Sequence, residues 1–172
     1  VNVTNVNDIA PVFTSEATFS AAENQTAIGT VTAIDAEGDD VTFTVTGDEL
    51  AITPSGVLTF ISDPDFETKA TYTAYVTVSD GINTVIQSLT VNVNDVNDYP
   101  QLLTSNNLYV DEGQINIVSL ETKDDDGDDV VVSMVDQDDY EYFILEPFTW
   151  NLSFKENSIP DYETKSSYSL TL

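Results

Sequence analysis

The sequence repeats itself at an interval of about 90 residues, and this repeat constrains the fold more than any other feature. Residues 1–8 match residues 91–98 at an offset of 90, and residues 35–41 match 124–130 at an offset of 89. Residues 64–69 match 160–165 at an offset of 96, so an extra acidic loop is expected around residues 135–142. Anchors that recur in one order indicate two copies of one structural unit.

The segments between these anchors alternate apolar and polar residues. Around residues 41–46, 71–78 and 88–93, apolar residues alternate mainly with Thr, Ser or Asn. A period of two is typical of antiparallel strands with one buried face, and residues 56–60 follow a Pro54-Ser55 turn as a further strand. About seven short strands in each ~90 residues predict an all-β chain built of β-sandwiches.

The repeat also predicts the domain boundaries. We expect residues 1–8 to be the last strand and linker of a preceding repeat, 9–98 to be one repeat, and 99–172 to be a second. Pro100 ends any strand that enters from residues 95–99, because proline has no N–H for the ladder. Leu172 aligns with Val76, so we expect the second repeat to lack its C-terminal strand. Two explanations stay open, a fragment of a longer array or a sandwich completed by a neighbouring chain.

Charge and missing residue types exclude several classes of function. The chain has 31 acidic and 4 basic residues and a net charge of −27, which repels nucleic acid and anionic lipid. It has no Cys and no His, which removes Ser–His and Cys–His nucleophiles and the usual zinc ligands. No apolar run approaches the roughly 20 residues of a membrane span. The acids lie between strand-like runs, so cations are their natural counterpart.

The ordered acidic motifs resemble those of cadherin repeats, in the compact form found in large bacterial surface proteins. Residues 95–100 resemble the D-x-N-D-x-x-P linker, shortened by one residue before the proline, and residues 5–11 resemble it at full spacing, with Asn5 in place of Asp. The other matches are an early Glu (Glu23), two D-x-D-like pairs (Asp35/Glu37 and Asp124/Asp126), two D-x-E pairs (Asp65/Glu67 and Asp161/Glu163) and a later Asp (Asp80). The resemblance spans nearly the whole chain and implies tandem Greek-key β-sandwiches.

The resemblance also implies Ca²⁺ as the cofactor, bound at the joints between repeats. Calcium takes about 6–8 oxygen ligands, and alternate residues of an extended loop point to one side. The implied ligands are Glu23, Asp65, Glu67, Asp95, Asn97, Asp98, Asp124 and Asp126 at the middle joint, Asn7, Asp8, Asp35, Glu37 and Asp80 at the joint before it, and Glu112, Asp161 and Glu163 at the joint after it. We expect Asn5 to weaken the first joint and the last group to be under-coordinated. Taken alone, a pair such as Asp80-Gly81 is also compatible with a simple hairpin turn.

The function implied by the resemblance is a structural or adhesive module of an extracellular tandem-repeat protein, stiffened by Ca²⁺. Its partners would be neighbouring repeats of the same or an identical chain, or another cell-surface protein. The alternative is a calcium-dependent module that binds polysaccharide, since Trp150 lies near Tyr140, Tyr142 and Phe148. Trp150 aligns with Gly56 at the start of a strand, which favours a place at the edge of the core.

Enzyme activity is not expected. A glycosidase needs two carboxyl groups held apart across a substrate cleft, whereas these acids recur at repeat boundaries in both copies. The acids of the extra loop, Asp136, Asp138, Asp139 and Glu141, are interpreted as a solvated tip rather than as a further site.

Overall fold

The computed structural model describes residues 1–4 and 6–172, which form two compact units, Val1–Val96 (unit 1) and Asn97–Leu172 (unit 2). Asn5, which we expected to weaken the first joint, lies outside the described residues. The chain is all-β, with one short 3-10 helix, η1 (Tyr140–Tyr142), in the described part. Within that part, no helix has the length and apolar character needed to span a bilayer.

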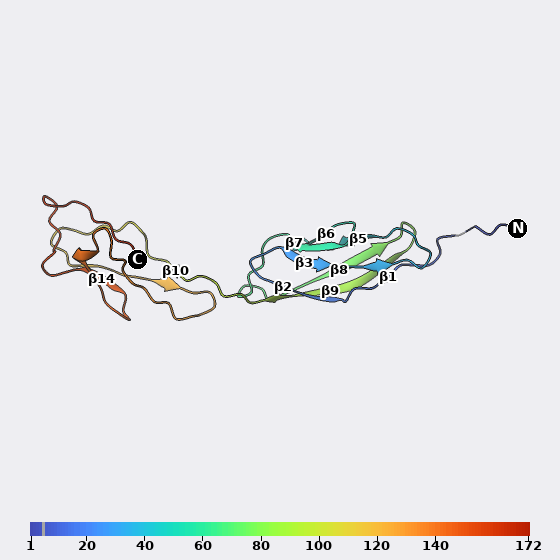
Figure 1. The fold of residues 1–172 in the computed structure, drawn as a ribbon, viewed down its shortest axis with the longest axis horizontal. Helices are drawn as coiled ribbons and strands as arrows, with labels where there is room; N and C mark the ends of the chain where they lie inside the picture. The colour runs from blue at the N-terminus through green and yellow to red at the C-terminus, as the bar shows by residue number, and fades with distance from the viewer. Residues whose placement is uncertain (5) are drawn as a thin grey trace. The chain divides into compact units, whose positions relative to one another are not determined.

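Unit 1 is a sandwich of two sheets and a short strand pair (Figure 1). The larger sheet runs in the order β2 (Thr18–Ala22), β9 (Thr84–Asn94), β8 (Thr71–Ser79) and β5 (Thr42–Val45). The smaller sheet runs β3 (Ala27–Thr30), β7 (Val57–Phe60) and β6 (Leu50–Ile52), and the pair is β1 (Val12–Phe13) with β4 (Ala33–Ile34). Buried side chains from both sheets form one cluster between them, as a sandwich requires.

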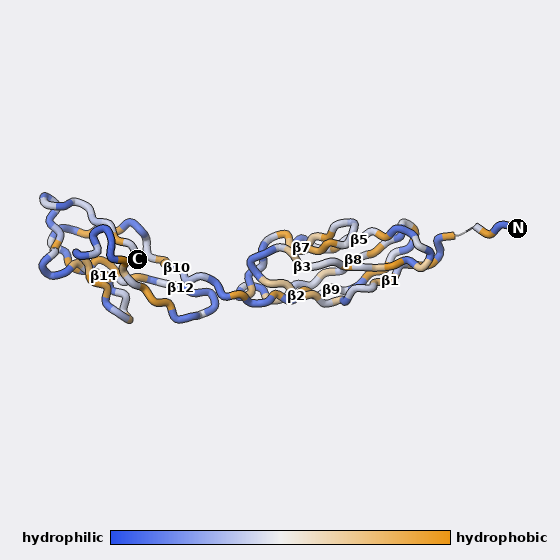
Figure 2. Tube along the Cα trace, in the orientation of Figure 1, coloured by the Kyte–Doolittle hydropathy of each residue, from blue (hydrophilic) through white to orange (hydrophobic). Residues whose placement is uncertain are grey.

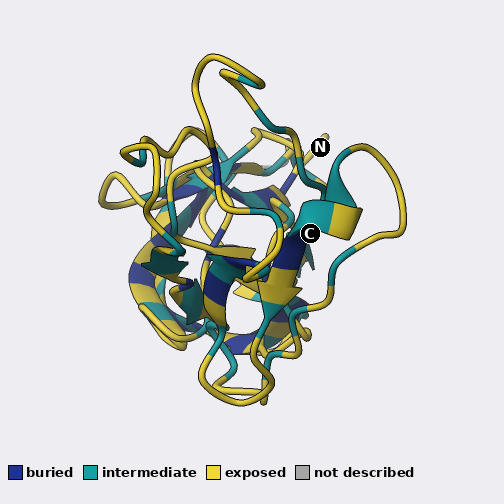
Figure 3. Cartoon of the chain, turned by 90° about the vertical axis from the view of Figure 1, so that its left-hand side faces the viewer, coloured by how far each residue is buried: buried dark blue, intermediate teal, exposed yellow. Residues whose placement is uncertain are grey.

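The core of unit 1 confirms the predicted alternation. Leu89, Val91 and Val93 of β9 are almost completely buried, and the Ser, Thr and Asn residues between them face outward or are half-buried. Val76 and Val78 of β8 are buried in the same way. The strands therefore carry alternating buried and exposed bands in Figure 3, while the loops at the ends of unit 1 are mostly hydrophilic in Figure 2.

One pairing differs from the sequence prediction. β9 is antiparallel to β8, as expected, but it pairs in parallel with β2, with Phe19 opposite Val91. A period of two shows which face of a strand is buried but carries no information about the direction of its neighbour.

Unit 2 repeats part of this plan. β10 (Gln101–Leu102) pairs with β12 (Thr122–Lys123), as β1 pairs with β4. A three-stranded sheet of β11 (Asn116–Ser119), β14 (Asn151–Phe154) and β13 (Phe143–Leu145) repeats β3, β7 and β6. Among its residues, all of which the structure describes, no strand corresponds to those of the four-stranded sheet.

Equivalent bonds show that the sequence repeat is a structural repeat. The N–H of Val31 donates to the carbonyl of Gly56 at 2.8 Å, and that of Leu120 donates to Trp150 at 2.9 Å. The rings of Phe60 and Tyr72 lie 5.0 Å apart at 66°. Their counterparts in unit 2, Phe154 and Tyr168, also lie 5.0 Å apart, at 68°.

Candidate metal centres

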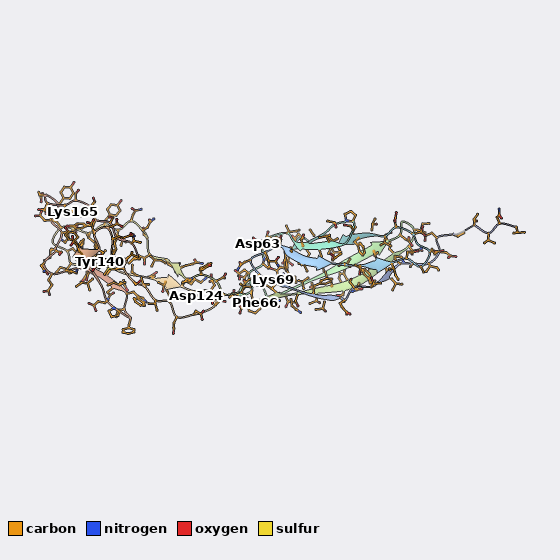
Figure 4. All side chains as sticks on the ribbon, viewed as in Figure 1. Asp63, Phe66, Lys69, Asp124, Tyr140 and Lys165 are labelled. Carbon is orange, nitrogen blue, oxygen red and sulfur yellow. The ribbon has the colours of Figure 1, made fainter. Side chains whose placement is uncertain are left out.

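One acidic group, the Glu23 cluster, consists of Glu23, Asp65 and Glu67 at one end of unit 1. One carboxylate oxygen from each residue lies within 4.8 Å of the others. Glu23 directly follows β2, and Figure 4 labels Phe66, which separates the other two acids in the loop between β7 and β8. The fold therefore brings together three predicted ligands that are up to 44 positions apart in the sequence.

Glu23 is held by two backbone N–H groups and is only 2% exposed. Its Oε1 accepts the N–H of Val96 at 2.8 Å, and its Oε2 accepts the N–H of Phe66 at 2.9 Å. Both oxygens act as acceptors, which suits the ionised carboxylate. Carboxylate oxygens about 4.8 Å apart repel by roughly 3 kcal/mol per pair at an effective dielectric constant of about 20. A cation at this position would remove that repulsion.

A second acidic group, the Asp35 cluster, consists of Asp35, Glu37 and Asp39, which again bring one oxygen each within 4.8 Å. It follows β4, which ends at Ile34. Oδ1 of Asp35 accepts the N–H of Glu37 at 2.8 Å, and Oε2 of Glu37 accepts the N–H groups of Asp8 and Ile9 at 2.8 and 2.9 Å. The predicted ligand pair Asp35/Glu37 is thus tied to the segment that enters unit 1.

The Asp35 cluster contains oxygen atoms whose environment fits a divalent cation. Oδ2 of Asp35 and Oδ2 of Asp39 are buried and have no hydrogen-bond partner among the described residues. Burial raises the pKa of Asp39, and the neighbouring charges of Asp35, Glu37, Asp80 and Asp40 raise it further. A buried oxygen that accepts no hydrogen bond lowers stability unless a cation or a water binds it. Carboxylate oxygens are ligands that Ca²⁺ prefers.

Asp80 and Asn7 complete the surroundings of the Asp35 cluster. Asp80 accepts the N–H groups of Ile82 and Asn83 at 2.8 and 2.6 Å. Burial works to raise its pKa, but these bonds and the side-chain amides of Asn83 and Asn7 lower it overall. Asn7 is bound to the turn that contains Asp80, because its Oδ1 accepts a hydrogen bond from the side-chain amide of Asn83 at 2.9 Å. Asp80 therefore forms the turn that its Asp-Gly pair allows, and its charge also acts on Asp39 of the cluster.

In unit 2, the Glu112 cluster of Glu112, Asp161 and Glu163 repeats the Glu23 cluster. Its three oxygens also lie within 4.8 Å, but all three residues are exposed. Glu112 accepts one N–H, from Tyr162, at 3.3 Å. In unit 1 the equivalent Glu accepts a second N–H, from Val96, which follows β9.

The remaining predicted ligands lie on both sides of the division between the units. Asp95 is exposed just after β9 in unit 1. In unit 2, Oδ2 of Asp126 accepts the N–H of Asp98 at 2.5 Å, as Glu37 does for Asp8. Asp124 accepts the N–H of Asp128 in its own loop at 3.1 Å, and the amide of Asn97 donates to the carbonyl of Asp98 at 2.7 Å.

Two residues at these sites were not predicted from the sequence. Asp39 was not assigned as a ligand, although Asp35, Glu37 and Asp39 continue one alternation, which was the available signal. Asn83, which connects Asn7 to Asp80, had no recognisable motif.

The aromatic residues around Trp150 do not form an open platform. Trp150 is half-buried, and so are Tyr140 and Tyr142. The ring of Tyr142 packs edge-on against Tyr168 at 5.3 Å. Phe148 alone is fully open, at 92% exposure. A sugar site built on stacked aromatic faces therefore has no support in this geometry.

The sequence profile of the family described as "Bacterial Ig domain" matches residues 7–94. No curated protein sequence matches the chain significantly.

Solved cadherin structures share the fold. Human protocadherin-24 EC1-2, form II, is 21% identical with a TM-score of 0.57, and the match covers 94% of this chain and 82% of that one. Human CDH23 EC21-23 is 20% identical with a TM-score of 0.54, covering 94% of this chain and 58% of that one. Mouse cadherin-23 EC22-24 is 19% identical with a TM-score of 0.50, covering 92% and 56%. At these identities the likeness shows a cadherin-like fold.

Proposed function

Because the chain belongs to the bacterial Ig domain family, we propose that it is a cadherin-like module of an extracellular, adhesive tandem-repeat protein, in which Ca²⁺ stiffens the connection between consecutive repeats. The observation that supports this most directly is the Asp35 cluster. It combines three converging carboxylates with two buried oxygens that lack a partner among the described residues. The ordinary alternative for acidic loops, full solvation, leaves no oxygen buried without a donor.

The residues that would hold Ca²⁺ follow from the clusters. Asp35, Glu37 and Asp39, with Asp80 and Asn7, would serve the connection that precedes unit 1. Glu23, Asp65 and Glu67 would serve the next connection, with further oxygens from the chain segment that joins the units and from the D-x-D loop, namely Asp95, Asn97, Asp98, Asp124 and Asp126. The Glu112 cluster would serve a connection to a following repeat. The ion supplies positive charge, and the chain supplies carboxylate and amide oxygens.

The proposed mechanism is thermodynamic linkage. Ions that bind only the ordered connection stabilise it by mass action, by about 2.7 kcal/mol when free Ca²⁺ is 100 times the Kd. Without ions, the clustered carboxylates repel one another, which favours conformations that spread them apart. Stiffness would then follow the calcium concentration outside the cell, and the neighbouring repeats would be the first partners of each module.

Small-angle X-ray scattering and calorimetry of the whole chain test this proposal. We expect added Ca²⁺ to bind with measurable heat and to narrow the distribution of interatomic distances relative to chelator, with Mg²⁺ much less effective. Glu67→Gln should weaken both effects, because Glu67 belongs to the Glu23 cluster. Asp63→Asn is the matched control, since it removes one charge from the same exposed loop outside the cluster. Scattering curves that coincide in Ca²⁺ and chelator would refute the stiffening, even if heat shows that ions bind.

A further inference from the structure

Two of the acids proposed to bind Ca²⁺, Asp65 and Glu67, lie in a loop of unit 1 that is anchored at both ends. At its start, the carbonyl of Pro64 accepts the N–H of Asn24 at 3.0 Å, so the loop is tied to the segment that follows β2. At its end, the N–H of Lys69 donates to the carbonyl of Asp65 at 2.8 Å, which closes the loop on itself. The positions of the two carboxylates therefore depend on where these ends are held.

The side chain of Lys69 fixes the end of this loop to another part of unit 1. Its Nζ pairs with the carboxylate of Glu49 and lies 4.4 Å from the centre of the Tyr72 ring on β8. Glu49 is itself held by the backbone, because its carbonyl accepts the N–H of Ile61 at 2.9 Å. Lys69 and Phe66, which separates the two acids, lie at the same end of unit 1 (Figure 4). The ion pair therefore connects the loop to the segment before β6, 20 residues earlier in the chain.

Unit 2 builds the same arrangement from a different loop. Lys165 is the counterpart of Lys69, and its N–H also closes a loop, by donating to the carbonyl of Asp161 at 2.9 Å. Its Nζ pairs with Asp139 and lies 4.9 Å from the centre of the Tyr168 ring. Asp139 belongs to the extra loop, whose acids were expected to form a solvated tip. That expectation is wrong for Asp139, because its side chain is paired and only 20% exposed.

The recurrence of this pair favours a local role for the lysine over a general contribution to stability. Exposed ion pairs add little to the free energy of unfolding, and the side chains of Lys69 and Glu49 are 41% and 47% exposed. The two pairs share their place in the repeat, directly after a loop that carries two acids of a proposed metal site. Residues that orient metal ligands without touching the ion have large effects on metal affinity.

We propose that Lys69 is a positioning residue of the Glu23 cluster, because it holds the loop in which Asp65 and Glu67 converge with Glu23 on a Ca²⁺ ion. This inference rests on the proposed function and adds to it a residue that does not itself bind the metal. Lys165 has the same role in unit 2.

Positioning and simple electrostatics predict opposite effects on calcium affinity. Lys69 is the one basic residue in the sequence of unit 1, so Lys69→Met leaves that unit with acidic side chains alone. A purely electrostatic effect would then strengthen Ca²⁺ binding, whereas loss of positioning weakens it. Lys69→Arg keeps the positive charge and should retain most of the affinity. Glu49→Gln breaks the pair from its other side and should weaken binding as Lys69→Met does.

Calcium titrations of the whole chain, followed by NMR, measure the two clusters of unit 1 separately. The amide of Phe66 donates to Glu23 and reports on the Glu23 cluster. The amide of Ile9 is bonded to the Asp35 cluster and serves as the internal control. In Lys69→Met, we expect the Kd measured at Phe66 to rise about tenfold and the Kd measured at Ile9 to stay unchanged.

A second measurement tests the loop without calcium. In chelator, amide hydrogen exchange at residues 65–69 should be about tenfold faster in Lys69→Met than in the wild type. Unchanged exchange in the core of β9 would show that unit 1 is folded. Lys165→Met is the matched control, because it removes the same charge from the equivalent pair in unit 2 and should leave the loop at residues 65–69 unchanged.

The outcomes separate this inference from the proposed function. If Ca²⁺ shifts the Phe66 amide of the wild type, an unchanged or lower Kd in Lys69→Met overturns the positioning role and leaves the proposed function intact. A wild-type Phe66 amide that does not respond to Ca²⁺ refutes calcium binding at the Glu23 cluster, and the positioning role with it.

Discussion

The carboxylate of Glu23 accepts the N–H of Val96 at 2.8 Å, which ties the chain leaving β9 to the end of β2. The equivalent Glu112 in unit 2 has no such donor and is exposed. One hydrogen bond across 73 residues thus accompanies the difference between a buried and an open acidic cluster in two copies of the same motif.

Glu23→Gln should lower the free energy of unfolding of unit 1 by about 1–3 kcal/mol in chelator. The amide offers one acceptor oxygen where two backbone donors are present, so one backbone N–H loses its partner. Glu112→Gln is the matched change in unit 2 and should stay within about 0.5 kcal/mol, because Glu112 is exposed. Hydrogen exchange in denaturant measures each unit separately. Equal losses in the two variants would contradict the assigned role of Val96.

Gly56→Ala should destabilise unit 1 by about 2–5 kcal/mol, the sum of left-handed backbone strain and overpacking. Gly56 has φ 91°, and a Cβ there would meet the carbonyl oxygen of Val31 at 2.2 Å. Gly47→Ala separates the two causes, because Gly47 also has φ 91° but has open space around it. It should lose only about 1–2 kcal/mol. Denaturant unfolding compares them, and similar losses would show that the contact with Val31 adds no cost.

Local pattern was enough to predict the strands and the sandwich, whereas the acids that gather at the ends of unit 1 were predicted from the resemblance to cadherin repeats. Leu89, Val91 and Val93 are buried because a period of two places them on one face, whatever lies beside them. The parallel pairing of β2 with β9 was not predictable in this way, since strand direction depends on how the chain returns from a distant segment.

Local sequence pattern was also insufficient to predict how the acidic clusters are buried. Glu23 and Glu112 are indistinguishable by motif, yet Glu23 is 2% exposed and accepts an N–H from a segment 73 residues away, whereas Glu112 is exposed. Asp39 was overlooked because a third acid in an acidic loop has no distinctive spacing, and only its buried, unpartnered oxygen marks it.

Asp39→Asn should have opposite effects with and without calcium. In chelator it should raise the melting temperature of unit 1, because it removes a charge that repels Asp35 and Glu37. With Ca²⁺ it should weaken binding, because it removes a ligand. Asp48→Asn, on an exposed turn of the same unit, is the control and should change neither.

The same residue predicts a pH dependence. The pKa of Asp39 is raised in the folded state, so protonation of Asp39 stabilises unit 1 in chelator. This stabilisation is complete below the ordinary pKa of 3.8 and is lost as the pH rises through the higher folded-state pKa. The variant should not show this loss. A variant that melts below the wild type in chelator at neutral pH would contradict the assigned repulsion.

Asp139→Asn should destabilise unit 2 at neutral pH. The side chain of Asp139 pairs with Lys165 and accepts the N–H of Ser169 at 2.9 Å, so it holds residues 165–169 against the loop before η1. The bond from Lys165 and then that from Ser169 lower the pKa of Asp139 against the opposing effect of burial. The stabilisation is therefore present above pH 3.8 and is lost as the pH falls below that value through the lower folded-state pKa.

The difference in melting temperature between wild type and Asp139→Asn, measured by thermal unfolding from pH 7 downward, should shrink over that acidic range. Asp136→Asn removes the same charge from an exposed position in the same loop and should leave unit 2 unchanged at every pH. A difference between wild type and Asp139→Asn that persists at the lowest pH would show that the charge on Asp139 is not its source.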